Sequence, residues 1–319
     1  MRKAFCLMSL LGWATLAGCE RWSDPRHALR KATGGQPLNQ IKAFGRGPMP
    51  FNRVLNLPEC DTLLNGEVSC RVMLDTGAGD MLILTPHITE QLGLKAVSDA
   101  QLAGVGGVAT GGMTLLEDLA IGDIRVERVV TFIAPESSPL LLISDGVLGT
   151  GVLRDGRVKL DFEQAELVVR PSSDDVGAGE EVPVSVSDSA HIFTTVLLQS
   201  VSVTAMLDSG ANQLIFSSSW LEQNYPDHPD VDLDLPLPRF ALGVEMGTPG
   251  ITTCANLEFA GRQMENVAGM ALEDVDRIVG PQMEEKIGVV IGMTIFRDMK
   301  SWTVDFPRER MWVDWLEEP

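Results

Sequence analysis

The sequence repeats itself, and this repeat constrains the fold more than any other feature of the chain. "VMLDTGAGDMLIL" beginning at Val72 returns as "AMLDSGANQLIF" beginning at Ala205, which places Asp208 at 208 − 75 = 133 residues after Asp75. Three further matches follow in the same order: "AGVGGVATGG" with "LGVEMGTPG", "VLGTGVLRD" with "VIGMTIFRD", and "LDFEQAELVV" with "VDFPRERMWV". Because the order is kept while the offset grows only slowly, the chain is expected to fold into two similar units.

The matches divide the chain into two lobes. We predict an N-terminal lobe over residues 47–171 and a C-terminal lobe over residues 181–319, joined by an acidic, Ser/Gly-rich linker at 172–180. Stretches such as "IRVERVVTFIA" and "RVKLDF" are rich in β-branched residues and partly alternate between apolar and polar positions, which is typical of strands. One short helix is expected after each aspartate segment. The fold class is therefore predicted to be mainly β.

Asp75 and Asp208 are acidic residues within apolar runs, where a single buried carboxylate would be costly. If the lobes face each other across a pseudo-twofold axis, the two carboxyl groups meet and share one proton, because adjacent like charges do not both form readily. Such a pair can hold a water molecule between an ionised member that acts as base and a protonated member that acts as acid. This is the chemistry that direct hydrolysis of an amide bond requires.

These motifs resemble those of the aspartic proteases of the pepsin and retropepsin superfamily. The matching pieces are Asp75-Thr76-Gly77-Ala78, Asp208-Ser209-Gly210-Ala211, Val147-Leu148-Gly149 and Val290-Ile291-Gly292. The resemblance implies two homologous retropepsin-like β-barrel lobes with the active site in the cleft between them. It also implies that Asp75 and Asp208 are the catalytic pair and that the hydroxyls that follow them lock the two loops together. The glycines of both motifs permit the tight turns that bring the loops close.

The resemblance predicts an aspartic endopeptidase that binds a peptide or protein substrate. Such an enzyme needs no cofactor and no metal, and we expect the protein to act as a monomer. The alternative is a peptide-binding lipoprotein that uses the same cleft but has lost turnover. Ala78 and Ala211 stand where many pepsins have a hydroxyl that holds the carboxylate pKa down, so a weakly acidic pH optimum is expected.

Two glycine-rich segments, 104–112 and 243–250, are the candidate flaps over the substrate. Pepsins carry a tyrosine in the flap, but the single tyrosine of this chain is Tyr225, outside both segments. The flaps therefore look closer to those of a fused retropepsin dimer. The candidate flap residues are Gly104, Gly106, Gly107, Gly243 and Gly247.

The N-terminus has the pattern of a bacterial lipoprotein. Residues 1–18 combine a charged start with a short apolar stretch, as a signal peptide does, and Leu16-Ala17-Gly18 precede Cys19 as a lipobox requires. Cys19 is therefore the predicted lipid anchor, which would tie the protein to a membrane and face it to the periplasm. An aspartate directly after the cysteine would resemble an inner-membrane retention signal. This chain has Glu20 at that position, so the outer membrane is favoured.

Residues 19–46 allow two interpretations. The segment after Cys19 carries an excess of positive charge ahead of an acidic body, from Arg21, Arg26, Arg30, Lys31, Lys42 and Arg46. It is either a flexible tether from the anchor or a short inhibitory pro-segment that lies in an acidic cleft.

Charge and cysteine usage exclude other classes. Without the two positive charges of the signal peptide, the net charge of −19 becomes −19 − 2 = −21, which repels nucleic acid. Cys60 and Cys70 flank an Asn65-Gly66 hairpin turn, so they form either a disulfide or two free buried thiols. The four histidines have no metal-ligand spacing and are expected to be ordinary surface or core residues.

Overall fold

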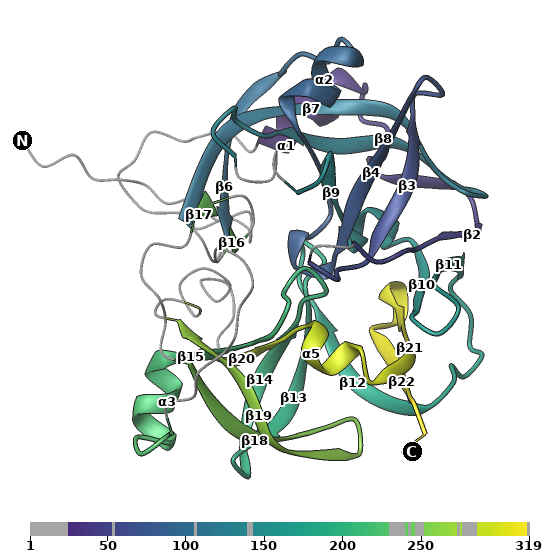
Figure 1. Ribbon diagram of the computed structural model, residues 1–319. Coiled ribbons are helices and arrows are strands. Elements are labelled where there is room, and N and C mark those ends of the chain that lie inside the picture. The colour runs from purple at the N-terminus through teal and green to yellow at the C-terminus, as the bar shows by residue number, and fades with distance from the viewer. Residues whose placement is uncertain are drawn as a thin grey trace, which may run out of the picture.

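The computed structural model describes residues 25–52, 55–104, 107–138, 143–229, 240–241, 244–245, 252–272, 275 and 286–317. Figure 1 shows two lobes of mainly β structure, one above the other, as the repeat predicted. The helices in the described residues are few and short: α1 (Pro25–Ala32), α2 (Pro86–Gln91), α3 (Ser218–Asn224) and α5 (Met293–Phe296). None of the helices in these ranges is long and apolar enough to cross a membrane.

The N-terminal lobe contains an eight-stranded sheet. Its strands, in spatial order, are β1 (Gln40–Ala43), β8 (Ile124–Ile133), β5 (Leu82–Leu84), β9 (Gly146–Gly149), β4 (Val68–Asp75), β3 (Glu59–Leu64), β7 (Gly107–Ile121) and β6 (Ser98–Gly104). Strands β7 and β8 also pair with each other, so the sheet folds back on itself. The alternating apolar side chains of these strands face a common core, which includes Leu64, Leu74 and Phe132.

The C-terminal lobe repeats this pattern. Its strands are β14 (Val201–Leu207), β20 (Ile287–Ile291), β15 (Leu214–Ser217), β19 (Arg262–Leu272), β18 (Thr252–Phe259) and β13 (Ile192–Leu198). Strands β16 (Phe240–Ala241) and β17 (Val244–Glu245) form a separate two-stranded sheet, which lies near β6 and β7 in Figure 1. In each lobe the strand that leads to the aspartate pairs in parallel with the strand of the downstream apolar-apolar-Gly element. Asp75 lies opposite Gly149, and Leu207 lies opposite Ile291.

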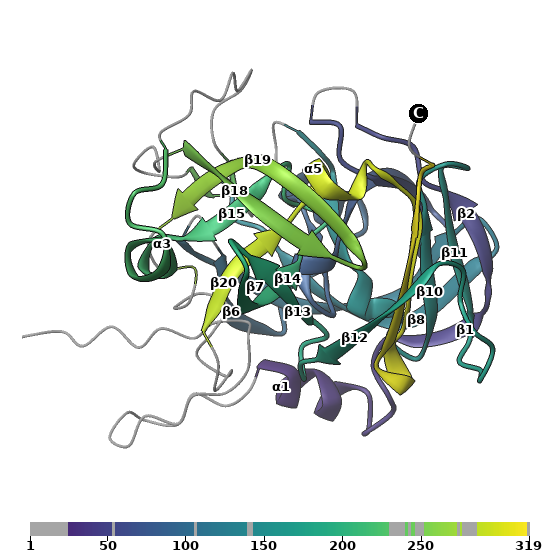
Figure 2. The ribbon, with the colours of Figure 1, turned by 90° about the horizontal axis from the view of Figure 1, so that it is seen from below.

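A sheet that spans both lobes joins them. Strands β12 (Glu180–Val186), β22 (Arg310–Trp315), β21 (Met299–Asp305), β10 (Gly156–Asp161), β11 (Glu166–Pro171) and β2 (Gly45–Pro48) continue the second sheet to twelve strands. Figure 2 shows β10, β11 and β12 together on one side of the molecule. At the centre Lys159 lies opposite Thr303, at 303 − 159 = 144 residues, which is the offset of the sequence repeat in this region. The pseudo-twofold axis therefore passes through this pair of residues.

The N-terminal segment is built into the fold. Helix α1 packs against β6 and β7, and its Leu29 is fully buried. Strand β1 pairs with β8, and β2 pairs with β11 across the predicted boundary at residue 46. Residues 40–46, ahead of the predicted lobe start at residue 47, thus pair with strands of that lobe. The backbone of residues 39–46 makes hydrogen bonds to β8, β11 and Asp123, so this part of the segment belongs to the folded body.

Candidate active site

Asp75 ends strand β4, and Asp208 directly follows strand β14. Each carboxyl group turns back over its own loop. The N–H of Gly77 donates to Asp75 Oδ1 at 2.7 Å, and the N–H of Gly210 donates to Asp208 Oδ1 at 2.8 Å. Both aspartates are buried, with 4% and 7% of their surface exposed. The two motifs of the repeat thus form the same local structure.

The two loops meet so closely that each carboxyl group packs against the glycine of the other loop. A Cβ atom on Gly77 would lie 2.7 Å from Asp208 Cγ, and a Cβ atom on Gly210 would lie 2.5 Å from Asp75 Oδ2. Neither distance is compatible with a side chain, because real Cβ contacts are longer. Glycine is therefore required at both positions by the approach of the opposite aspartate. Gly292, downstream, is also crowded, with its Cβ position 2.5 Å from the carbonyl oxygen of Ala211.

Thr76 and Ser209 connect the loops through reciprocal hydrogen bonds. The N–H of Thr76 donates to Ser209 Oγ at 3.1 Å, and the N–H of Ser209 donates to Thr76 Oγ1 at 2.9 Å. The hydroxyls in turn donate to main-chain carbonyls of the opposite lobe, Thr76 to Leu207 at 2.7 Å and Ser209 to Leu74 at 2.9 Å. Both side chains are fully buried. These bonds hold the two aspartates in register.

The surroundings of the pair favour one shared proton. Burial is the largest cause that raises the pKa of Asp75 well above its ordinary value, and the charge of Asp208 and a hydrogen bond to it raise this pKa further. Burial also raises the pKa of Asp208, although hydrogen bonds from Asp75 and from backbone N–H groups oppose the effect. The direction for both groups is upward, because two desolvated carboxylates in contact disfavour the doubly ionised state. The two groups therefore titrate as a pair that shares one proton.

Ala78 and Ala211 contribute through their backbones. Burial raises the pKa of both aspartates, and the N–H groups of Ala78 and Ala211 act against it by lowering the pKa of Asp75 and Asp208, respectively. The N–H of Ala211 donates to the main-chain carbonyl oxygen of Asp208 at 3.2 Å. Their small side chains bring no hydroxyl to the carboxyl groups, as the sequence indicated.

Strands β6, β7 and β17, which carry the described parts of the candidate flap segments, lie close together in Figure 1. Strands β6 and β7 form an antiparallel hairpin with Gly104 opposite Gly107, and β17 of the other lobe contacts β7. The structure therefore places Gly104 and Gly107 at the end of a hairpin. Three predicted flap residues lie outside the described residues: Gly106, Gly243 and Gly247.

The structure adds residues that the sequence did not single out. His191 is buried beside the first loop, with Nε2 at 3.0 Å from the carbonyl oxygen of Gly77. Asp80, five residues after Asp75, is bound by the guanidinium of Arg26 through two hydrogen bonds, one of which also forms the ion pair. Sequence reasoning had no signal for these contacts, because each joins segments that are far apart in the chain. The only related sequence feature was that Asp80 lies within the same motif as Asp75.

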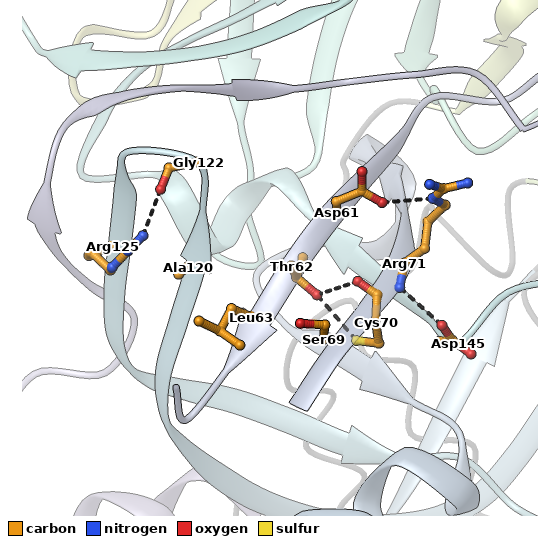
Figure 3. A pocket seen from close by; sticks show the side chains of 10 residues that line it. All are labelled: Asp61, Thr62, Leu63, Ser69, Cys70, Arg71, Ala120, Gly122, Arg125 and Asp145. Atoms are coloured by element: carbon orange, nitrogen blue, oxygen red, sulfur yellow. Dashed lines mark hydrogen bonds and ion pairs between the residues drawn. The ribbon is translucent and has the colours of Figure 1, made fainter. Parts of the chain in front are cut away.

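The possible disulfide between Cys60 and Cys70 is not formed, and both thiols are free. The hairpin register sets Cys60 opposite Val72 and Cys70 opposite Thr62, so the two sulfur atoms are not in directly facing positions. Cys70 instead lies 3.2 Å from the Thr62 hydroxyl. Figure 3 shows Cys70 in a pocket on the outside of the N-terminal lobe, which Arg71 and Asp145 also line. This pocket does not include either aspartate of the pair.

Two other predicted features have limited structural description. The predicted lipid anchor Cys19 lies outside the described residues. Within the described ranges, no group of three or more His, Cys, Asp and Glu side chains is arranged to hold a metal ion.

Comparisons with known proteins agree with this geometry. Residues 61–153 match the family model of an aspartyl protease. An aspartic proteinase from Irpex lacteus has a similar structure, with a TM-score of 0.52 and 12% sequence identity over 85% of this chain and 98% of that one. Basic 7S globulin from soybean is similar to the same degree, with a TM-score of 0.51 and 10% identity over 86% of this chain and 95% of the globulin. No curated protein matches the sequence.

The chain has a bilobal, pepsin-like fold, and residues 61–153 are similar to an aspartyl protease domain. The aspartyl protease match lies in the N-terminal lobe, and the C-terminal lobe repeats its architecture and its motif. The identities of 10% and 12% carry the fold alone.

Proposed function

We propose that this protein is an aspartic endopeptidase that hydrolyses peptide bonds with a water molecule activated by Asp75 and Asp208. The observation that carries the proposal is the pair of buried carboxyl groups, each packed against the glycine of the other loop. A buried carboxyl pair in a structural role would cost stability without compensation, whereas a proton-sharing pair is useful for acid–base chemistry.

The mechanism follows from the shared proton. The ionised carboxylate removes a proton from the bound water as the water oxygen attacks the peptide carbonyl carbon, and the protonated carboxyl group gives its proton to the carbonyl oxygen. The product is a neutral tetrahedral diol, and one proton again remains on the pair. When the C–N bond breaks, a proton passes from the pair to the leaving nitrogen, and the diol loses a proton as it becomes the carboxylic acid. The rigid loops, which Thr76 and Ser209 fix in place, hold the carboxyl groups in line with the water and the peptide bond. This alignment lowers the entropic part of the activation barrier.

The substrate proposed for this site is an extended peptide or an extended segment of a protein. The β6–β7 hairpin offers strand edges to which such a segment can add main-chain hydrogen bonds. Specificity would then come from side-chain pockets along the segment.

We also propose that the protein works as a monomer anchored through lipidated Cys19, facing the periplasm and most favourably at the outer membrane. The support is the Leu16-Ala17-Gly18-Cys19 sequence and the distance of 25 − 19 = 6 residues from the cysteine to the first residue of α1. Metabolic labelling with a radioactive fatty acid tests the anchor. Label should enter the wild-type protein and be absent from Cys19→Ser, and label in both proteins would overturn the assignment.

The activity is tested by incubating the purified protein with a diverse peptide library and identifying the products by mass spectrometry. Wild type should cleave peptides, and the isosteric variants Asp75→Asn and Asp208→Asn should not. The inhibitor pepstatin gives an independent comparison. Tight binding of peptides without cleavage by wild type and variants alike would instead favour the peptide-binding lipoprotein.

A further inference from the structure

His191 lies immediately before strand β13 and is 5% exposed. Its Nε2 atom is 3.0 Å from the carbonyl oxygen of Gly77, and its Nδ1 atom is 2.8 Å from Ser189 Oγ. A carbonyl oxygen can only accept a hydrogen bond, so the ring proton must be on Nε2. Nδ1 is then the acceptor, and the Ser189 hydroxyl donates to it. The contacts thus select one neutral tautomer of the ring.

Ser187 extends this hydrogen-bond network on the side of the ring away from Gly77. The Ser187 hydroxyl lies 3.1 Å from Ser189 Oγ, and the backbone N–H of His191 donates to Ser187 Oγ at 3.0 Å. Both ring nitrogens therefore have a hydrogen-bond partner. The Ser189 hydroxyl donates to the ring, and the ring donates to the carbonyl oxygen of Gly77. A nucleophilic Ser189 does not fit this arrangement, since Ser189 is only 4% exposed and the far nitrogen of the ring faces a carbonyl group.

The carbonyl group that His191 binds is half of a peptide unit that also contacts Asp75. The C=O of Gly77 and the N–H of Ala78 belong to one planar peptide group, and the N–H of Ala78 acts against burial to lower the pKa of the Asp75 carboxyl group. The N–H of Gly77 itself donates to Asp75 Oδ1 at 2.7 Å, so His191 holds the residue that binds the carboxyl group. A hydrogen bond to the oxygen of a peptide strengthens the hydrogen bond that its N–H donates, because the bonds polarise one another. His191, in the C-terminal lobe, is therefore one peptide away from the aspartate of the N-terminal lobe.

This device is present on one side of the pseudo-twofold axis. Met73 and Met206 stand two residues before the two aspartates, and their partners across the hairpins are Glu59 and Phe193, at 193 − 59 = 134 residues. The residue of the N-terminal lobe that corresponds to His191 is consequently Leu57, at 191 − 134 = 57, whose side chain has no hydrogen-bond donor. The shared fold does not require a histidine at this position. The difference makes the two aspartates unequal.

The ring is neutral chiefly because it is buried, and a nearby positive charge adds to the effect. Burial lowers the pKa of His191 to about 4, the bond to Gly77 opposes this shift, and the charge of Arg26 on α1 adds to it. Arg26 is itself held by Asp80, which follows the first loop, and Asp75 lies on the far side of the bridging peptide. The ring therefore donates to Gly77 in its neutral form throughout the weakly acidic and neutral range.

We propose that His191 is a positioning residue, which orients the Gly77–Ala78 peptide toward Asp75 and so favours the ionised state of the aspartate pair. The inference rests on the proposed endopeptidase activity and adds a residue that controls the pair from outside the two motifs. His191 does not touch the substrate. It acts through the peptide group alone.

The test compares His191→Phe, which removes the donor at similar size, with His191→Gln, whose amide N–H can reach the same carbonyl group. For His191→Phe we expect kcat to fall about tenfold, as one lost hydrogen bond in the transition state implies, and KM to change less than about twofold. The acid limb of the kcat/KM profile should move to higher pH by about half a unit, because the ionised pair has lost a stabilising donor. His191→Gln should restore most of the rate and return the limb toward its wild-type position.

Ser189→Ala and His87→Phe complete the set. Ser189→Ala keeps the ring but removes the donor that fixes its tautomer. The acid limb of its kcat/KM profile should therefore shift in the same direction by a smaller amount. This variant provides the test if His191→Phe does not fold. His87 is exposed on α2, and its replacement should behave as wild type. A wild-type acid limb in both His191→Phe and Ser189→Ala would overturn the proposal, as would equal losses in the Phe and Gln variants.

A measurement that needs no turnover separates this inference from the proposed function. The carboxyl carbons of the aspartates can be labelled with ¹³C and titrated by NMR in wild type and in the His191 variants. The first proton should leave the pair at higher pH in His191→Phe than in wild type, and an unchanged titration would overturn the proposal. Absence of peptide cleavage by wild type, together with the expected change in titration, would refute the endopeptidase and leave the role of His191 intact.

Discussion

Thr76 and Ser209 donate their hydroxyl hydrogens to the main-chain carbonyl groups that precede the opposite aspartates, Leu207 and Leu74. Each hydroxyl oxygen also accepts the backbone N–H of the other residue. The two lobes are thus joined directly beneath the carboxyl pair. The hydroxyl residue that follows each aspartate therefore fixes the distance between the two halves of the site.

Thr76→Ala should lose both stability and activity. The change leaves the Leu207 carbonyl and the Ser209 N–H without a partner in a buried position, which costs about 1–3 kcal/mol per unsatisfied group. We expect kcat/KM on a cleaved peptide to fall by more than about tenfold. Chemical denaturation and steady-state kinetics measure the two effects. Thr76→Ser keeps the hydroxyl and is the matched control, and equal losses in the Ser and Ala variants would contradict the assignment.

The pH dependence of activity follows from the raised pKa values of the pair. Activity requires one proton on the pair, so it falls at low pH, where both members are protonated, and at high pH, where both are ionised. Because the pKa of Asp75 is raised well above its ordinary value, the high-pH limb should extend toward neutrality and give a weakly acidic optimum. A kcat/KM profile with its maximum at strongly acidic pH would contradict this expectation.

The stability of the protein should respond to pH through the same group. A carboxyl group with a raised pKa in the folded state stabilises the protein at low pH, and this contribution is lost as the pH rises through the folded pKa. Asp75→Asn carries no charge, so its melting temperature should exceed that of wild type at neutral pH. The difference should shrink as the pH falls from the raised folded pKa to the ordinary pKa of aspartate, and it should level off below that value. Differential scanning calorimetry across this range measures it, and a difference that grows at low pH would show the opposite sign.

Arg157 of β10 and Asp305 of β21 form a buried ion pair in the sheet that joins the lobes, with Nη2 and Oδ2 at 3.1 Å. Arg157→Met leaves the Asp305 carboxylate buried without its counter-charge, so we expect the free energy of unfolding to fall by about 3–5 kcal/mol. The exposed pair between Arg46 and Glu166 is the control. Arg46→Met should change this free energy by less than about 1 kcal/mol, because exposed ion pairs contribute little. Equal effects would show that burial does not decide the difference.

The cysteines should behave as buried thiols. Burial is the main cause that raises the pKa of Cys60 to about 12 and that of Cys70 to about 11, so neither thiol forms much reactive thiolate at pH 8. In the folded protein, iodoacetamide should label Cys254, which is partly exposed, before Cys60 or Cys70. Peptide mapping by mass spectrometry measures the labelling. A melting temperature that falls on addition of a reducing agent would instead indicate a disulfide.

Much of the fold was accessible from the repeat. The two aspartate motifs, the downstream Gly149 and Gly292, and the strand patterns between them predicted two mainly β lobes with the motifs at their meeting point. The pairing of β1 and β2 was not accessible, because both carry short, mixed sequences whose partners, β8 and β11, lie far along the chain. The hairpin register was also not accessible, and it sets Cys60 and Cys70 out of direct opposition.

The sequence by itself determined that the chain has two equivalent halves and that each half contributes one carboxyl group, because a repeat is visible without coordinates. The tertiary structure decided what makes the halves unequal. His191 lies 191 − 77 = 114 residues from Gly77, and Arg26 lies 80 − 26 = 54 residues from Asp80, so no local pattern connects either pair. Such contacts depend on how the sheets twist and where the lobes meet. They exist only once the whole chain has folded, because their hydrogen bonds join surfaces that packing alone brings together.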